Sequence, residues 1–285
     1  MSNSSRPAGP IDAAHAPTFS HALQALATRA PRTGVPFLEA FKVHYGPPGL
    51  LGRFFLSADT RLKERGITLQ FITMEELVIL SRDNADNWGS PNPMFDPSFA
   101  DISPGTMCLV GIDTTGVIRT CIAAKPIDSS AQTFGSVIDA GGFLSLKPGC
   151  NVENLQTTIN APFALEKRGL VAFCGLVWVH PEARGLRLPS IFAHLMFACV
   201  LTLWNPDYLI GFVNHATYDS ALNHRYYMSH GEEAMTITRN GEFLVKLVLL
   251  WTSAEQSLAG LGRYLDELWP QIDAAVIARN RQQSA

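Results

Sequence analysis

Residues 169–179 read Gly169-Leu-Val-Ala-Phe-Cys-Gly-Leu-Val-Trp-Val179, and they run directly into His180-Pro-Glu-Ala-Arg-Gly185. An unbroken apolar run of this length predicts a strand that is covered on both faces, and such a strand belongs in the middle of a sheet. The longer apolar stretch at residues 188–204 predicts a buried helix. A central strand, a turn and a core helix therefore follow one another in the chain.

The stretch at residues 188–204 has an alternative interpretation as a membrane span. It falls short of the roughly 20 apolar residues that a spanning helix needs. It also carries His194 near its centre, and a strand-like segment follows it at residues 208–213. These features favour a helix buried in a globular domain.

The segments before the central strand predict a strand, a helix and a hairpin. Residues 67–72 alternate as a strand, and Thr73-Met-Glu-Glu76 has the form of a capping box that opens a helix. Two further strand-like runs, at residues 107–112 and 117–124, flank a short polar turn and predict the hairpin.

The segments after the core helix predict a similar alternation. Residues 208–213 predict a strand and residues 218–229 a helix. A final hairpin is predicted for residues 234–238 and 243–251, because the Asn240-Gly241 pair between them is a strong turn signal. The predicted order is strand, helix, hairpin, central strand, helix, strand, helix, hairpin.

The bulk composition indicates a globular protein and excludes several function classes. The chain has 285 residues, 47% of them hydrophobic and 16% charged, with a formal net charge of -3. No bulk attraction to nucleic acid or to a membrane is expected from this charge. The five cysteines form no CxxC pair and no cluster with histidine, which predicts neither a disulfide framework nor a metal site. The N-terminus lacks the apolar core of a signal peptide, so a cytoplasmic location is expected.

One main domain with flanking segments is expected. The predicted parts are a flexible N-terminal arm (1–35), a helical lead-in (36–66), the domain itself (67–253) with an irregular insertion (128–167), and a C-terminal helical segment (254–285). The C-terminal helices could pack on the domain or on a second copy of the chain.

The order of elements and the segment Val179-His-Pro-Glu-Ala-Arg-Gly185 resemble the GCN5-related N-acetyltransferase (GNAT) superfamily, as a divergent member, over about residues 67–251. In that family V-x-P-x-x-R-G leads from the central strand into the loop that binds the pyrophosphate of coenzyme A. The resemblance implies an α/β (α+β) fold with a mixed, mostly antiparallel central sheet flanked by helices. It also implies acetyl-CoA or another acyl-CoA as co-substrate, without a metal.

A loop between a strand and a helix can bind phosphate for a general physical reason. Free backbone N–H groups and the positive end of the helix dipole meet there. Arg184 and Arg187 add guanidinium groups, each of which can hold a phosphate through two hydrogen bonds. These side chains could equally be solvated charges at the helix entry. The resemblance places the phosphate-binding positions at Arg184, Gly185, Leu186, Arg187, Leu188 and Ser190.

Two positions depart from the family's loop Q/R-x-x-G-x-G/A. Arg187 stands at the first motif glycine, and Pro189 stands at the following Gly or Ala. Glycine lets the backbone approach a phosphate closely, whereas proline supplies no N–H. Proline is nevertheless well suited to a first helical turn. We therefore expect the turn to survive with an altered phosphate cradle.

The central strand is expected to bind the pantetheine arm with its backbone. In the family this strand diverges from its neighbour and pairs with the arm as though adding a strand. By resemblance, Val177 and Val179 would supply the N–H and C=O groups, while Trp178 points to the opposite face. Asn214 could orient the donor amide, or serve turn chemistry after its strand. Cys174 lies in the same strand and is rejected as a nucleophile.

The resemblance also suggests catalytic residues. Tyr227 lies four residues before Gly231, at the position of the tyrosine that protonates the departing thiolate in many members. Its alternative role is packing. Glu182 and His215 are candidates for the base, because each follows a strand at the edge where ligands bind in open sheets, although each could be a surface or capping residue.

The predicted function is an acyl-CoA-dependent N-acyltransferase that acts on an amine of a small molecule or peptide. One alternative is a catalytically silent binding or regulatory module of the same fold, which the residues at positions 187 and 189 favour. Another is an acyltransferase that resembles autoinducer synthases and uses a longer acyl chain. In that case the insertion at residues 128–167 would form part of the acyl pocket.

Overall fold

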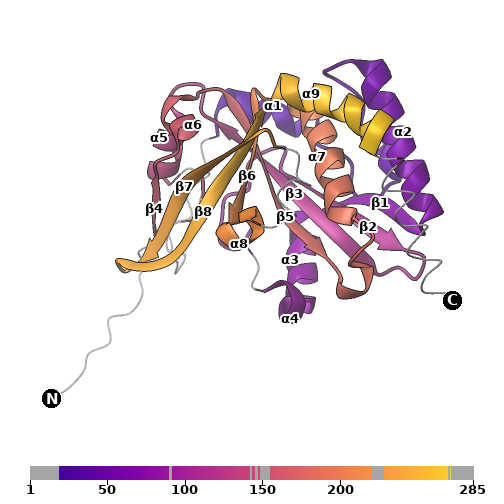
Figure 1. The fold of residues 1–285 in the computed structure, drawn as a ribbon, viewed down its shortest axis with the longest axis horizontal. Helices are drawn as coiled ribbons and strands as arrows, with labels where there is room; N and C mark the ends of the chain where they lie inside the picture. Colours follow the sequence, from indigo (N-terminus) through magenta and orange to yellow (C-terminus); the bar gives the residue numbers. More distant parts are fainter. Residues whose placement is uncertain are drawn as a thin grey trace.

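The computed structural model describes residues 19–89, 92–141, 143–144, 147, 155–219, 228–268 and 270. Its described strands form one sheet of eight in the order β1-β2-β3-β5-β6-β8-β7-β4 (Figure 1). Their bounds are β1 Ile67–Ile72, β2 Met107–Asp113, β3 Ile118–Asp128, β4 Leu155–Ile159, β5 Leu170–Val179, β6 Tyr208–Asn214, β7 His230–Arg239 and β8 Glu242–Ser253.

Helices cover both faces of this sheet. Their bounds are α1 His21–Ala27, α2 Pro48–Glu64, α3 Met74–Asp83, α4 Ala85–Trp88, α5 Phe134–Asp139, α6 Pro162–Glu166, α7 Leu188–Trp204, α8 His215–Asp219 and α9 Ala254–Arg263. α2, α7 and α9 lie on one face, in front of the sheet in Figure 1. α3, α5 and α6 pack on the other face.

The sheet is mixed and mostly antiparallel. The parallel pair is β5 with β6, and the other described neighbours pair antiparallel. β5 lies inside the sheet, as its continuous apolar run predicted, and the capping box at Thr73 is present at the start of α3. The predicted fold class is therefore confirmed.

The core helix α7 has the bounds predicted for it. Its side chains are buried almost throughout, and it packs on β3 and β5 between α2 and α9. It ends at Asn205, which adopts the left-handed conformation (φ 52°) that often terminates a helix. Among the described residues, no helix is both long and apolar enough to cross a membrane.

The N-terminal segment differs from the expected arm over residues 19–35. Leu23 and Leu26 on α1 are buried in the core, and the Ser20 hydroxyl donates a hydrogen bond of 2.5 Å to Asp128 at the end of β3. Composition suggested disorder, but these two leucines lie on one helical face and can be buried. The first part of the expected arm lies outside the described residues.

The insertion at residues 128–167 also differs from the expected irregular segment, because it contributes α5, β4 and α6. β4 pairs with β7 and lengthens the sheet by an edge strand beside the β7–β8 hairpin (Figure 1). The helix expected at residues 218–229 begins earlier, at His215, and positions 220–227 lie outside the described residues.

Candidate functional site

β5 and β6 pair only at one end and then diverge. Their register covers Val171 to Phe173 of β5, opposite Tyr208 to Ile210 of β6. A bulge lies just beyond, where β5 shifts its pairing with β3 and Leu176 takes a positive φ of 53°. A bulge bends its strand and increases the local twist. The backbone of β5 thereby leaves its parallel neighbour, and a gap opens inside the sheet.

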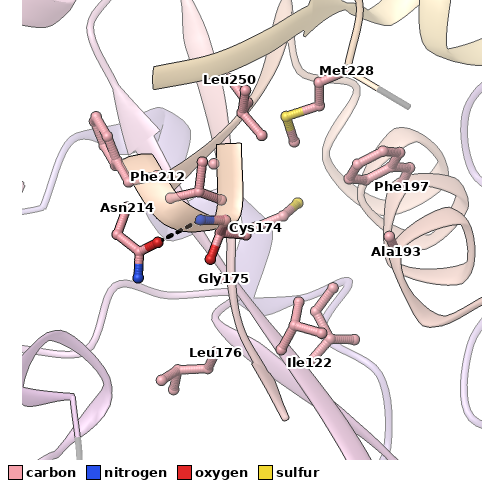
Figure 2. Close-up of a pocket in the computed structure, with 14 residues that line it drawn as sticks. Ile122, Cys174, Gly175, Leu176, Ala193, Phe197, Phe212, Asn214, Met228 and Leu250 are labelled. Atoms are coloured by element: carbon pink, nitrogen blue, oxygen red, sulfur yellow. Dashed lines mark hydrogen bonds between the residues drawn. The ribbon is translucent and has the colours of Figure 1, made fainter. Parts of the chain in front are cut away.

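A cavity of about 280 Å³ lies at this gap. Figure 2 shows its walls, with Ala193 and Phe197 of α7 on one side and Phe212 and Asn214 of β6 on the other. The side chains that line it are apolar except those of Asn214 and Thr217, and none of them in the described part of the chain is charged. Such a cavity suits a neutral, elongated chemical group.

The edge of β5 that faces the cavity is identified by hydrogen bonds on its other edge. The His180 N–H donates to the Arg119 carbonyl (2.9 Å), and the Trp178 carbonyl accepts from the Thr120 hydroxyl (2.8 Å), both on the β3 side. Backbone groups of a strand alternate between its two edges. Those of Val177 and Val179 therefore point toward the gap, where β6 no longer pairs with them.

The surroundings of Trp178 and Cys174 indicate packing roles and not catalysis. The Trp178 ring is 4% exposed and stacks on Trp88 at 5.0 Å, on the face of the sheet opposite α7. Burial raises the pKa of the Cys174 thiol well above its ordinary value. A thiol that stays protonated is a poor nucleophile, which agrees with the rejection of Cys174.

The loop between β5 and α7, residues 180–187, turns sharply at its end. Gly185 has a φ of 97°, and Arg187 is the N-cap in the left-handed conformation with an exposed side chain. Arg187 provides no side-chain cap for the helix. The helix therefore does not continue back through Arg184, and the Arg187 side chain does not fill the cavity.

The first turn of α7 offers backbone donors without intrahelical acceptors. These N–H groups belong to Leu188 and Ser190, because Pro189 between them has none. The Ser190 hydroxyl is buried and has no partner among the described residues. Ala193, which lines the cavity, lies about one helical turn, roughly 5 Å, farther along α7. The donors and the cavity are thus neighbours.

Asn214 lies at the cavity but caps a helix. Its Oδ1 accepts a 2.7 Å hydrogen bond from the Thr217 N–H in α8, drawn dashed in Figure 2. The amide nitrogen of Asn214 remains for another partner. This arrangement agrees with the turn chemistry that the sequence offered as its alternative role.

Of the three candidate catalytic residues, the two that the structure describes lie away from the cavity lining. The Glu182 carboxylate accepts a hydrogen bond from Arg119 on β3, and its side chain is 72% exposed. His215 faces Glu233 at 3.9 Å. Neither residue lines the cavity. Tyr227 lies outside the described residues.

Other features of the site were missed by sequence reasoning. Met228 and Leu250 also line the cavity, and Arg119 contacts the loop at residues 180–187. Nothing in the local pattern marks Leu176 as a bulge residue, because apolar strand residues rarely adopt positive φ. Within the described part of the chain, no group of His, Cys, Asp or Glu side chains is arranged to hold a metal.

Comparisons with known proteins give structural matches only. No family model matches the chain, and no curated protein matches its sequence. The structure is similar to that of the spermidine/spermine N-acetyltransferase SpeG of Vibrio cholerae, at 10% identity, 68% coverage of this chain, 98% of that chain and a TM-score of 0.38. It is similar to NAA60 of Arabidopsis thaliana in complex with acetyl-CoA, at 10% identity, 66% and 99% coverage and a TM-score of 0.40.

A third match is the ribosomal-protein-S5-alanine acetyltransferase of Vibrio fischeri, at 8% identity, 67% and 94% coverage and a TM-score of 0.37. Overlays this loose transfer neither substrate nor mechanism to the chain. The conclusions on its fold rest on its own strand order and on the diverging pair β5 and β6.

Proposed function

We propose that the chain is a divergent member of the GNAT superfamily and an acyl-CoA-dependent N-acyltransferase, which transfers an acyl group from a coenzyme A thioester to an amine. The observation that carries this proposal is the gap between β5 and β6, which has a free backbone edge and a cavity lined mainly by apolar side chains next to the start of α7. Coenzyme A has an elongated pantetheine arm that ends in phosphates. The arm would lie along the strand edge and the cavity, and the phosphates would lie at the start of α7.

The donor would be held in two parts. The pantetheine amides would pair with the backbone of Val177 and Val179 as an added strand, while Asn214 offers its amide nitrogen nearby. The phosphates would lie at the start of α7, where the positive helix end favours anions. The proposed phosphate-binding residues there are Arg184, Gly185, Leu186, Arg187, Leu188 and Ser190.

The reaction would be a direct transfer. The amine nitrogen attacks the thioester carbon, a C–N bond forms, and the C–S bond breaks to release the coenzyme A thiolate. Tyr227 is the proposed acid that protonates this thiolate, since a phenol with a pKa of about 10 suits a thiolate near 8.5. The proton leaving the amine would pass to His215 or to water. We assign Glu182 no base role, because Arg119 holds its carboxylate.

A silent binding module of the same fold is the competing function. It is favoured by Pro189, which removes one backbone donor from the phosphate cradle. Such a module would bind an acyl-CoA weakly or not at all, and it would transfer nothing.

Calorimetric titration of the purified protein with acetyl-CoA and longer acyl-CoAs separates these functions. The proposal predicts saturable binding of at least one donor, followed by release of free thiol when a library of amines is added. The acyl length that binds most tightly also tests the long-chain alternative. Binding without thiol release from any amine would favour the silent module, and absence of binding would contradict the proposal.

A further inference from the structure

Arg119 on β3 connects two segments that are far apart in the sequence. Its side chain is 18% exposed, and its Nε donates a 2.6 Å hydrogen bond to Asp113 at the end of β2. Its Nη1 lies 2.9 Å from the His180 Nδ1 and donates to Glu182. The guanidinium thus joins the β2–β3 hairpin to the loop at residues 180–187 between β5 and α7.

The hairpin fixes the first partner of this guanidinium. The Thr115 hydroxyl and the N–H groups of Thr115 and Val117 all donate to Asp113 Oδ1, at 2.7 to 3.0 Å. These bonds, with Thr115 contributing most and Arg119 adding to them, hold the pKa of Asp113 well below its ordinary value. Asp113 is therefore an ionised anchor whose position is set by its own turn.

The loop residues are oriented by the same guanidinium. The Glu182 N–H donates to His180 Nδ1 at 3.3 Å, and Arg119 donates to that same nitrogen. The His180 ring is therefore held between the loop backbone and the Arg119 guanidinium. Asp113, and then Glu182, raise the pKa of Arg119 through their hydrogen bonds.

We propose that Arg119 is a positioning residue for donor binding, because it holds the loop at residues 180–187 in the form that presents the start of α7 to the donor phosphates. This inference rests on the proposed function. Arg119 itself is not a phosphate ligand, since two carboxylates occupy its guanidinium. It also pairs with the exposed Glu182 carboxylate of the same loop.

Binding of two ligands, coenzyme A and pantetheine, distinguishes a loss of loop positioning from general damage to the fold. Coenzyme A carries the phosphates, and pantetheine is the same arm without them. Arg119→Gln should weaken coenzyme A binding on the order of tenfold, the size expected when a contact that orients a ligand-binding group is lost. Pantetheine affinity should be unchanged. The coenzyme A affinity of Arg119→Lys should lie between those of the wild type and Arg119→Gln, because lysine keeps the positive charge but lacks the planar guanidinium.

A matched control is Arg82→Gln, which removes an arginine paired at 3.6 Å with the buried Asp96 in a different part of the molecule. It should leave the affinities for both ligands unchanged. Amide hydrogen exchange gives a second readout that needs no ligand. In Arg119→Gln, exchange should accelerate at residues 180–190 and stay unchanged in β8.

Three outcomes would overturn the inference. These are equal coenzyme A affinity in Arg119→Gln and the wild type, equal loss of coenzyme A and pantetheine, and unchanged exchange at residues 180–190. If the wild-type protein binds no coenzyme A, the proposed function itself fails. That result is separate from the first outcome, in which the wild type binds and the variant binds equally well.

Discussion

Pro189 limits the number of backbone donors at the start of α7. It is the second residue of the helix and stands between the N–H groups of Leu188 and Ser190. In Pro189→Ala the missing N–H is restored. Because a hydrogen bond to a charged group contributes about 1.5 kcal/mol or more, coenzyme A should bind about tenfold more tightly.

Calorimetry measures this change directly. Pro162→Ala is the control, since Pro162 occupies the first position of α6 on the other side of the sheet and its replacement should leave the affinity unchanged. Equal affinities of Pro189→Ala and the wild type would place the phosphates away from this helix end.

Tyr227 carries the proposed acid function. Tyr227→Phe removes the phenolic proton and keeps the ring, so turnover should fall on the order of a hundredfold while donor affinity stays nearly constant. Steady-state kinetics together with calorimetry separate the two quantities. Equal turnover of variant and wild type would remove Tyr227 from the mechanism.

The burial of His194 predicts how the stability of the fold changes at low pH. It is 2% exposed, stacks on Tyr264 at 3.8 Å, and contacts the Ser190 carbonyl through Nδ1 at 2.8 Å. Burial lowers its pKa from 6.5 to about 4. Folding therefore favours the neutral ring. This contribution is complete above pH 6.5 and is lost as the pH falls toward 4.

Urea unfolding at several pH values tests this prediction. The free energy of unfolding should fall by up to about 3 kcal/mol between pH 7 and pH 4 through His194 alone. His194→Phe keeps a ring for the stack and should flatten this dependence. An identical pH profile in both proteins would show that His194 does not govern the acid response.

At the level of the elements, the divergence of β5 from β6 is the feature on which the proposed donor binding depends. Gly211 on β6 faces this gap, where an added Cβ would lie 3.2 Å from the Cys174 carbonyl and 3.6 Å from the Met228 methyl. Gly211→Val should occupy part of the cavity and weaken acyl-CoA binding at least about tenfold, while overpacking costs about 1–3 kcal/mol of stability.

Gly52→Val on α2 is the matched substitution, because nothing lies within 4 Å of the added Cβ there. Donor affinity by calorimetry and thermal unfolding should be measured for both variants. If Gly211→Val binds acyl-CoA as the wild type does, the donor does not use this cavity.

Elements with strong local patterns were predicted well from the sequence. α7 has the predicted bounds, and β2, β3, β7 and β8 form the two predicted hairpins, because periodicity and turn residues determine such elements locally. The edge strand β4 was not predicted. Its sequence Leu155-Gln-Thr-Thr-Ile159 is short, and it is a strand because it pairs with β7, a contact that no local pattern reveals.

The candidate site was predicted in part. The turn before α7 is present as the motif predicted. Val177 and Val179 were named from the family resemblance, and their role in donor binding stays a prediction. The pairing of Glu182 with Arg119 joins residues 63 positions apart. Only the folded sheet brings these two residues together. The sequence alone therefore suggested Glu182 as a base, whereas in the structure Glu182 forms an ion pair with Arg119.

For the molecule as a whole, one sheet and two helical layers bring the cavity, the open strand edge and the start of α7 into one region, which gives a proposed path for the donor. The two core clusters lie on opposite faces of the sheet. The cavity lies between β5 and β6, where these two strands diverge. The central claim is that a coenzyme A thioester follows this path.

A crystal structure with bound coenzyme A tests this claim most directly. We expect pantetheine between β5 and β6, hydrogen-bonded to the backbone of Val177 and Val179, with the diphosphate at the N–H groups of Leu188 and Ser190. Coenzyme A bound elsewhere, with β5 and β6 closed against each other, would contradict it.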